Sequence, residues 1–330
     1  MGTYRQSLSD EGLERIQLRS QALELSVLPG VGGKIFDLVD RRSGRNWLWH
    51  NPHLAPTRPH PNADFNLEQD SGGWDEILLS TSPADIETDA GTVLRVSDHG
   101  DLLGADWSVE RLHASPDGDA VCDMAVIGAA APYRFRRRIR LLGNRPVVKL
   151  DYALSNAGAT PVPCYWCAHP LLAVERGSAI GIAGNMPLRV EDELTQTGRG
   201  DCSTQRWPEL QLEGGDSVNL AESFGINGDA RRFAKKLFVR SPDSGSVEVR
   251  LNDPRERLVM TFDPDELPWV GLWINNRGWS GCGSEPYMNL GLEPAMTPYD
   301  SVNEAIANDA IDWLGPGETR SWALKLELYM

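Results

Sequence analysis

The sequence predicts an all-β protein built as one large antiparallel sandwich, with few short helices. Short apolar runs rich in strand-forming residues recur, turn clusters separate them, and few windows keep a helical period. Turn-forming residues are abundant, with 32 Gly and 22 Pro in 330 residues. Many short strands joined by turns are typical of an antiparallel sandwich. We expect strands at residues 23–28, 93–96, 147–154, 247–251, 258–262, 270–274 and 322–328.

The chain shows no sign of division into smaller units. Hydrophobic residues make up 41% of the sequence, which is enough for a sizeable core. No shift in composition marks a linker, and neither an internal repeat nor a low-complexity tract is present. Because all-β sandwiches often exceed the usual domain length, we expect residues 1–330 to form a single domain.

Two of the expected strands reveal their faces through alternation. In residues 322–328, Trp322, Leu324, Leu326 and Leu328 alternate with smaller or polar residues, which predicts that these four side chains face inward. In residues 134–140 every even position is arginine, whereas Phe135 and Ile139 share the other face. The arginine face is expected to be solvated or to meet an anionic partner.

Two further segments carry local signals. Ser301 followed three residues later by Glu304 matches a capping box, which predicts one short helix or turn within residues 301–310. Residues 30–33 read Gly-Val-Gly-Gly after a strand, but residues 34–38 alternate like another strand. A dinucleotide-binding loop needs a helix at that point, so this function is not predicted.

Charge and cysteine usage narrow the possible partners. The net charge of −15 argues against nucleic acid and anionic membranes as partners. No apolar run approaches the roughly 20 residues that span a bilayer, and residues 1–10 lack an apolar signal core, so we expect a cytoplasmic protein. Among the five cysteines, Cys164 and Cys167 form a CxxC spacing inside an apolar strand-like run. Alternation would point them to opposite faces, so buried thiols are expected rather than a metal or redox pair.

Three segments place polar groups in apolar surroundings. The first contains Trp74 and Asp75 after two glycines, with His99 downstream, and an aromatic ring beside carboxylates suits the C–H face and hydroxyls of a sugar. The second ends an apolar run at His169, and imidazole is the side chain best able to exchange a proton near pH 7. The third sets Glu293 among Leu290, Leu292 and Pro294, where a carboxylate must be paired, hydrogen-bonded or functional.

Each of these residues also has a structural interpretation. A lone histidine at the end of an apolar run is often a satisfied core residue, and a carboxylate in an apolar run is often one half of a local ion pair. His99, His169 and Glu293 could in principle bind zinc, but no HExxH motif or other short-range ligand pair is present. We therefore predict no metal site.

The order of several segments resembles the aldose 1-epimerases, from about residue 20 to the end. Residues 28–35 and 40–49 resemble the opening hairpin of that family. Residues 149–158, running on to Ala168-His169-Pro170, resemble its central strand pair, and Gly291-Leu292-Glu293-Pro294 with Pro298-Tyr299-Asp300-Ser301 resembles its glutamate motif. Residues 314–319 resemble the closing turn before the last strand.

The resemblance implies a galactose mutarotase-like β supersandwich that interconverts the α and β anomers of a sugar without a cofactor. His169 falls on the family's general acid, Glu293 on its general base, and His99 on the histidine that binds the sugar ring. No arginine matches the one that typical members place before that histidine, and Leu171 replaces the usual aromatic after His-Pro. Asp75 is our candidate for the aspartate that holds sugar hydroxyls, and Trp74 and Trp273 are candidate stacking platforms, as is Trp279.

Two other functions stay open at this point. The same fold can bind a sugar without catalysis, because a fold does not determine a function. An epimerase acting on an acidic or sulfonated sugar is the other alternative, which the arginine-rich strand at residues 134–140 suggests. The partner in each case is a small sugar, and the protein itself is expected to be a monomer or a homodimer.

Overall fold

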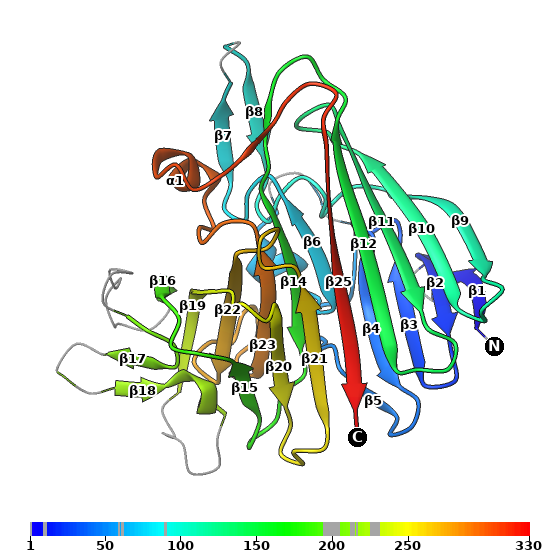
Figure 1. Cartoon of the computed structure of the whole chain (residues 1–330), viewed down its shortest axis with the longest axis vertical. Helices are drawn as coiled ribbons and strands as arrows, with labels where there is room; N and C mark the ends of the chain where they lie inside the picture. Colours follow the sequence, from blue (N-terminus) through cyan, green and yellow to red (C-terminus); the bar gives the residue numbers. More distant parts are fainter. Residues whose placement is uncertain are drawn as a thin grey trace.

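The computed structural model describes residues 2–8, 12–58, 60, 63–88, 91–193, 205–211, 215, 217–224 and 232–330. It confirms the predicted all-β supersandwich, in which two large antiparallel sheets pack face to face (Figure 1). In the described part of the chain, the helices are α1 (Val302–Ala307), the π-helix η1 (Phe65–Gln69) and the 3-10 helix η2 (Leu220–Glu222). None of them is long and apolar enough to cross a membrane.

The larger sheet has the strand order β1-β2-β3-β4-β6-β14-β23-β22-β19-β16, with β5 paired to β4. Its strands are β1 (Thr3–Leu8), β2 (Glu14–Arg19), β3 (Leu23–Leu28), β4 (Lys34–Asp40), β5 (Arg45–Asn46), β6 (Trp74–Leu78), β14 (Trp166–Leu172), β16 (Leu188–Glu193), β19 (Phe233–Arg240), β22 (Trp269–Asn276) and β23 (Met288–Ala295). Strands distant in sequence therefore meet at its centre, where β14 lies between β6 and β23.

The second sheet has the order β15-β20-β21-β25-β12-β11-β10-β9. Its strands are β9 (Ser108–Ala114), β10 (Ala120–Ile127), β11 (Tyr133–Leu141), β12 (Val147–Asn156), β15 (Ala179–Ile182), β20 (Ser246–Arg250), β21 (Arg257–Phe262) and β25 (Thr319–Tyr329). Three small pairs complete the fold: β7 (Ala84–Glu87) with β8 (Val93–Val96), β13 (Val162–Pro163) with β24 (Trp313–Leu314), and β17 (Glu209–Gln211) with β18 (Ser217–Asn219).

Most sequence-based expectations about local structure are confirmed. All seven expected strands are present, and Trp322, Leu324, Leu326 and Leu328 of β25 are buried as the alternation predicted. Ser301 caps α1 by accepting a hydrogen bond from the backbone N–H of Glu304. Residues 34–40 form strand β4 rather than a helix. Cys164 and Cys167 are buried thiols, whereas Cys202 lies outside the described residues.

Aromatic side chains fill the space between the two sheets. The ring centroids of Trp166 on β14 and Trp322 on β25 are 5.0 Å apart, and Tyr152 on β12 stacks on Trp322 at 5.6 Å. Such pairs bury large apolar areas at favourable ring geometries. They fix β14, the central strand of the larger sheet, against the middle of the second sheet.

A charged pair lies inside this apolar layer, which the sequence pattern did not indicate. The even-numbered arginines of β11 do face outward, where Arg134 and Arg136 pair with Glu110 and Arg138 pairs with Asp123. Arg137, however, shares the inward face with Phe135 and Ile139.

Every partner of the Arg137 guanidinium is buried with it. Arg137 Nη1 donates to Glu76 Oε1 at 2.9 Å, and neither side chain has exposed surface. The two oxygens of Glu76 also accept from Tyr152 Oη at 2.9 Å and Trp166 Nε1 at 3.1 Å, while Arg137 donates to the carbonyl of Gly33. A charge pair in such surroundings is tolerated only when its hydrogen-bonding groups find partners.

Breaking this buried pair is expected to destabilise the fold strongly. Arg137→Met leaves Glu76 as an unpaired buried carboxylate, which typically costs about 3–5 kcal/mol of unfolding free energy. Arg138→Met on the same strand removes an exposed pair with Asp123 and is expected to cost at most about 1 kcal/mol. Urea denaturation of both variants measures the difference, and equal losses would contradict the structural role of the buried pair.

Candidate functional site

The larger sheet has two chemically different faces, and the candidate site lies on the face turned away from the second sheet. Along β14, Trp166 and Ala168 point into the sandwich, whereas Cys167, His169 and Leu171 point the other way. The register of the antiparallel β14–β23 pair matches Cys167 with Ala295 and Leu171 with Gly291. His169 and Glu293 therefore lie opposite each other on adjacent strands and on the same face.

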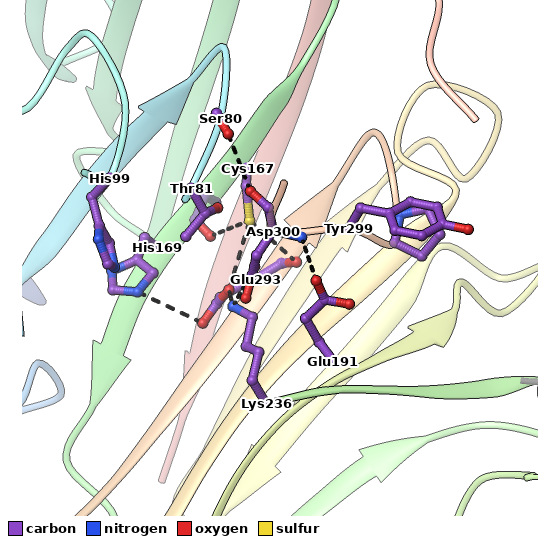
Figure 2. Close-up of polar contacts among 12 residues, drawn as sticks. Ser80, Thr81, His99, Cys167, His169, Glu191, Lys236, Glu293, Tyr299 and Asp300 are labelled. Atoms are coloured by element: carbon purple, nitrogen blue, oxygen red, sulfur yellow. Dashed lines mark hydrogen bonds and ion pairs between the residues drawn. The ribbon is translucent and has the colours of Figure 1, made fainter. Parts of the chain in front are cut away.

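The side chains of His169 and Glu293 meet, as the sequence-based hypothesis required. His169 Nε2 lies 3.9 Å from Glu293 Oε1, and the Glu293 side chain has no exposed surface (Figure 2). Within the described residues, Glu293 Oε1 has no hydrogen-bond partner. An unpartnered carboxylate oxygen beside an imidazole has the residue types that acid–base chemistry uses.

Two glycines make room for the Glu293 carboxylate. Gly271 lies directly opposite Glu293 on β22, and Gly291 precedes it by two residues on the same face of β23. A Cβ atom at Gly271 would lie 2.9 Å from Glu293 Oε2, and one at Gly291 would lie even closer to Oε1. The glycine of the Gly-Leu-Glu motif therefore leaves the space that the glutamate carboxylate needs.

A lysine holds the other oxygen of this carboxylate. Lys236 on β19 contacts Glu293 Oε2, and its Nζ lies 3.8 Å from Asp300 Oδ1, in the segment between β23 and α1. The Sγ of Cys167 lies 3.7 Å from the same Oε2. Figure 2 shows Lys236 reaching up between Glu293 and Asp300, with the two histidines on the far side of Glu293.

His99 approaches His169 from a strained loop after β8. Its backbone has a φ of 57°, in the left-handed region that non-glycine residues rarely adopt, and such strain often accompanies functional sites. Nδ1 of His99 lies 2.9 Å from Asp98 Oδ1, and the ring stacks on Phe65 with centroids 3.5 Å apart. The ring also meets His169 edge-on at 5.4 Å, so neighbours fix its position from three sides.

A pocket of about 200 Å³ opens beside this cluster. Its lining consists of Asn66, Asp70, Thr81, Ser82, Pro83, Asp98, His99, His169, Leu171, Lys236, Trp273, Trp279 and Asp300. The rings of Trp273 and Trp279 meet edge-on at 5.7 Å and supply an aromatic wall. Glu293 is absent from the lining because it lies behind His169 and Lys236.

Burial and neighbouring charges set the protonation of the central pair. Burial lowers the pKa of His169 well below its ordinary value, and the neighbouring His99 and Lys236 lower it further. Burial raises the pKa of Glu293, although the Lys236 ammonium partly offsets this effect. Burial thus favours the neutral form of each group, whereas the Lys236 ammonium favours the carboxylate form of Glu293.

The structure brings four of the six predicted site residues together and separates two. His99, His169 and Trp273 line the pocket and Glu293 lies against His169, but Trp74 is buried in the core with 1% of its surface exposed. Asp75 shares the face of His169, yet its Oδ2 accepts a hydrogen bond from Lys34 Nζ at 2.6 Å and does not reach the pocket. Its burial and the lysine correct the expectation of sugar contact.

Three pocket residues were not recognised in the sequence. Lys236 follows Lys235 inside the mostly apolar strand β19. Lysines are rarely buried unless they are paired, so this pattern indicates a buried ion pair. Asp70 and Asp300 lie in turns with many other acidic residues, where sequence alone does not distinguish a pocket carboxylate from a solvated one. Among the described residues, no group of three or more His, Cys, Asp or Glu is arranged to hold a metal ion.

The architecture is the galactose mutarotase-like β-sandwich, which confirms the resemblance seen in the sequence. A candidate aldose 1-epimerase from Klebsiella pneumoniae superposes with a TM-score of 0.72 at 14% identity, over 99% of this chain and 83% of that one. A galactose mutarotase-like protein from Clostridium acetobutylicum gives 0.69 at 14% identity, over 99% of both chains. A candidate aldose 1-epimerase from Escherichia coli gives 0.61 at 14% identity, over the full length of both.

Identities at this level establish a shared fold. The sequence matches no protein-family model and no curated protein sequence.

Asp70 supplies a test of the pocket's electrostatics that does not depend on activity. Burial raises its pKa to about 6, so the folded protein binds this proton more tightly than the unfolded chain. Its contribution to stability is therefore lost as pH rises from about 4 to about 6. Asp70→Asn should gain about 3 kcal/mol of unfolding free energy relative to the wild type across that interval, measured by urea denaturation at several pH values. Parallel stability curves would contradict the burial of an ionisable Asp70.

Proposed function

We propose that the protein is an aldose 1-epimerase that interconverts sugar anomers by acid–base ring opening. The observation that carries this proposal is the approach of His169 Nε2 to within 3.9 Å of the unpartnered Glu293 Oε1, beside a pocket walled by tryptophan. A pyranose presents a C–H face to aromatic rings and hydroxyls to carboxylates, and the pocket offers both. The fold shared with mutarotase-like proteins supports the same reaction class.

In the proposed reaction, Glu293 Oε1 takes the proton of the anomeric O1 hydroxyl while His169 gives a proton to the ring oxygen O5. The C1–O5 bond opens, the aldehyde turns about the C1–C2 bond, and the same two groups act in reverse to close the ring. O1 and O5 are both bonded to C1, so two neighbouring groups on one face of the sheet can serve both oxygens. His99 and Trp273 hold the ring in place.

The pKa shifts of His169 and Glu293 bear on how strong the proposed acid and base are. Burial lowers the pKa of His169 and raises that of Glu293, and because Nε2 and Oε1 lie 3.9 Å apart, the protonation of one group affects that of the other. An imidazolium with a lowered pKa is a strong acid toward O5, and a carboxylate with a raised pKa is a strong base toward O1. The rate is therefore expected to follow a bell-shaped pH profile whose two limbs belong to the pair.

The pocket lining favours a neutral sugar over an anionic one. Among the described residues that line the pocket, Lys236 is the lysine, it already contacts Glu293, and none is an arginine. The arginines of β11 that suggested an acidic or sulfonated substrate lie on the outer face of the second sheet or inside the sandwich. Asp70, Asp98 and Asp300 in the lining would repel a phosphate or sulfonate group.

Removing either partner of the pair is expected to abolish mutarotation. Glu293→Gln and His169→Asn should each slow anomeric exchange by about 10²-fold or more, because a positioned proton-transfer group contributes about 10²–10⁴-fold. Exchange NMR on freshly dissolved neutral aldoses measures the rate, and circular dichroism checks the fold. Unchanged exchange in folded Glu293→Gln would remove the assignment.

The same measurement distinguishes the alternative functions. Sugar binding without faster exchange in the wild type would indicate a carbohydrate-binding protein. Acceleration confined to acidic or sulfonated sugars within a mixed panel would indicate the modified-sugar epimerase instead.

A methyl group at Gly291 is expected to disturb the base without disrupting the fold. Gly291→Ala places a Cβ against Glu293 Oε1 and must displace the carboxylate. A displacement of about 1 Å can cost about 10²-fold in rate, whereas overpacking typically costs about 1–3 kcal/mol of stability. Gly44→Ala is a matched control, because it strains a φ of 79° in open space far from the pocket. Equal rates in both variants would show that the glycine does not position Glu293.

A further inference from the structure

Lys236 separates the buried carboxylate of Glu293 from the pocket. Its side chain lines the pocket, whereas that of Glu293 has no exposed surface. The ammonium contacts Oε2 only, and Oε1 faces His169 without a hydrogen-bond partner among the described residues. The two oxygens of this carboxylate therefore differ, because Oε2 contacts a cation and Oε1 has no hydrogen-bond partner among the described residues.

Asp300 offers the same lysine a second acceptor. Its Oδ1 is buried, lies 3.8 Å from Lys236 Nζ and has no hydrogen-bond partner in the described part of the chain. The backbone of Asp300 is held on both sides: its N–H donates to Glu191 Oε1 at 3.1 Å, and its carbonyl accepts from the N–H groups of Thr81 and Ser82 at 2.9 Å. The backbone that carries this carboxylate is thus held in place, and the flexible lysine stem can turn toward it.

We propose that Lys236 is a positioning residue that moves between two carboxylates in step with the proton. It holds Glu293 Oε2 while Glu293 is ionised, which leaves Oε1 as the oxygen that acts on the sugar, and it turns to Asp300 Oδ1 when Glu293 is protonated. This inference rests on the proposed function, since the proton in question comes from the anomeric hydroxyl.

The charges balance at each stage of this exchange. Before ring opening, the ammonium and the Glu293 carboxylate form a neutral pair beside the Asp300 carboxylate. When the O1–H proton moves to Oε1, Glu293 becomes neutral and the ammonium loses its partner. Asp300, whose Oδ1 lies 3.8 Å from Nζ, is then the remaining anion with which the ammonium can pair. No bond to Lys236 forms or breaks, and the second proton passes between His169 and O5.

The other ionisable groups around Glu293 do not take this role. From β14 the carboxylate meets His169 and Cys167, with Tyr165 bonded to the carbonyl of Asp300, and from the loop after β8 it is near His99. Glu191 on β16 binds the backbone of Asp300, and Lys34 on β4 pairs with Asp75. Lys236 is, among the described residues, the cation that the structure shows in contact with Glu293.

The two partners of Lys236 act on Glu293 in opposite directions. After burial itself, which raises the pKa of Glu293, Lys236 is the largest influence and lowers it, whereas Asp300 raises it. Lys236 also lowers the pKa of His169, so both limbs of the pH profile should move together when the lysine is removed. Loss of the Lys236 charge is therefore expected to shift the pH profile to higher pH, and loss of the Asp300 charge to shift it to lower pH.

The test compares Lys236→Met, Lys236→Arg and Asp300→Asn with the wild type. The carboxyl ¹³C signal of Glu293, assigned by its loss in Glu293→Gln, is titrated without sugar, and kcat and KM for a neutral aldose are measured over the same pH range.

Lys236→Met should raise the pKa of Glu293 and both limbs of the profile by about one unit or more. Asp300→Asn should lower the pKa of Glu293 and both limbs of the profile, by a smaller amount than Lys236→Met raises them. It should also reduce kcat more than it raises KM, because Lys236 then stays on Glu293. Lys236→Arg keeps the positive charge, so the pKa of Glu293 and the limbs of the pH profile should stay on the wild-type side.

The controls separate this role from a structural one and from the proposed function. Lys325→Met on β25 removes the same charge far from the site and should leave the titration and the profile unchanged. If Lys236→Met and Asp300→Asn lower the rate without shifting the Glu293 titration in opposite directions, the proposal is overturned. If Lys236→Met does not fold, the direction of the shift in Asp300→Asn decides. Opposite shifts in a protein that never accelerates anomeric exchange would reject the mutarotase function and the proton-coupled movement with it.

Discussion

The organisation of the molecule depends on alternation along the central strands of the larger sheet. On β14, Trp166 and Ala168 pack into the sandwich while Cys167 and His169 face the pocket, and β6 and β23 follow the same rule. The apolar half of each strand supplies the free energy of burial, and the other half is free to carry polar groups. Because neighbouring strands keep this register, residues more than a hundred positions apart meet at fixed distances.

Burial of the two central ionisable side chains has a cost in free energy. A carboxylate with no exposed surface and a histidine with little exposed surface are both driven toward their neutral forms. Lys236 partly offsets this effect at Glu293, and two glycines leave room for its carboxylate, whereas His99 adds to the effect at His169. His169 and Glu293 are thus held side by side next to the pocket, in the arrangement that the proposed acid–base reaction requires.

The sequence predicted the fold well because strand signals are local. Alternation and turn residues mark β3, β8 and β25 without reference to the rest of the chain, and Ser301 marks the start of α1. Site residues were harder to predict, because a side chain's surroundings depend on strands far away in sequence. Arg137 was not singled out, and Asp75 was a candidate sugar ligand, whereas the packing of β6 against β11 and β4 gives each a buried ion-pair partner.

The adjacent carboxylates of β6 have a consequence for how this fold can vary. Asp75 belongs to the pocket side and Glu76 to the sandwich interior, and each already has its own cation, Lys34 and Arg137 respectively. Inserting or deleting a single residue in β6 would exchange these surroundings and leave two cations facing the wrong acids. Evolutionary changes in chain length should therefore be confined to the connecting loops, while the central strands keep their length.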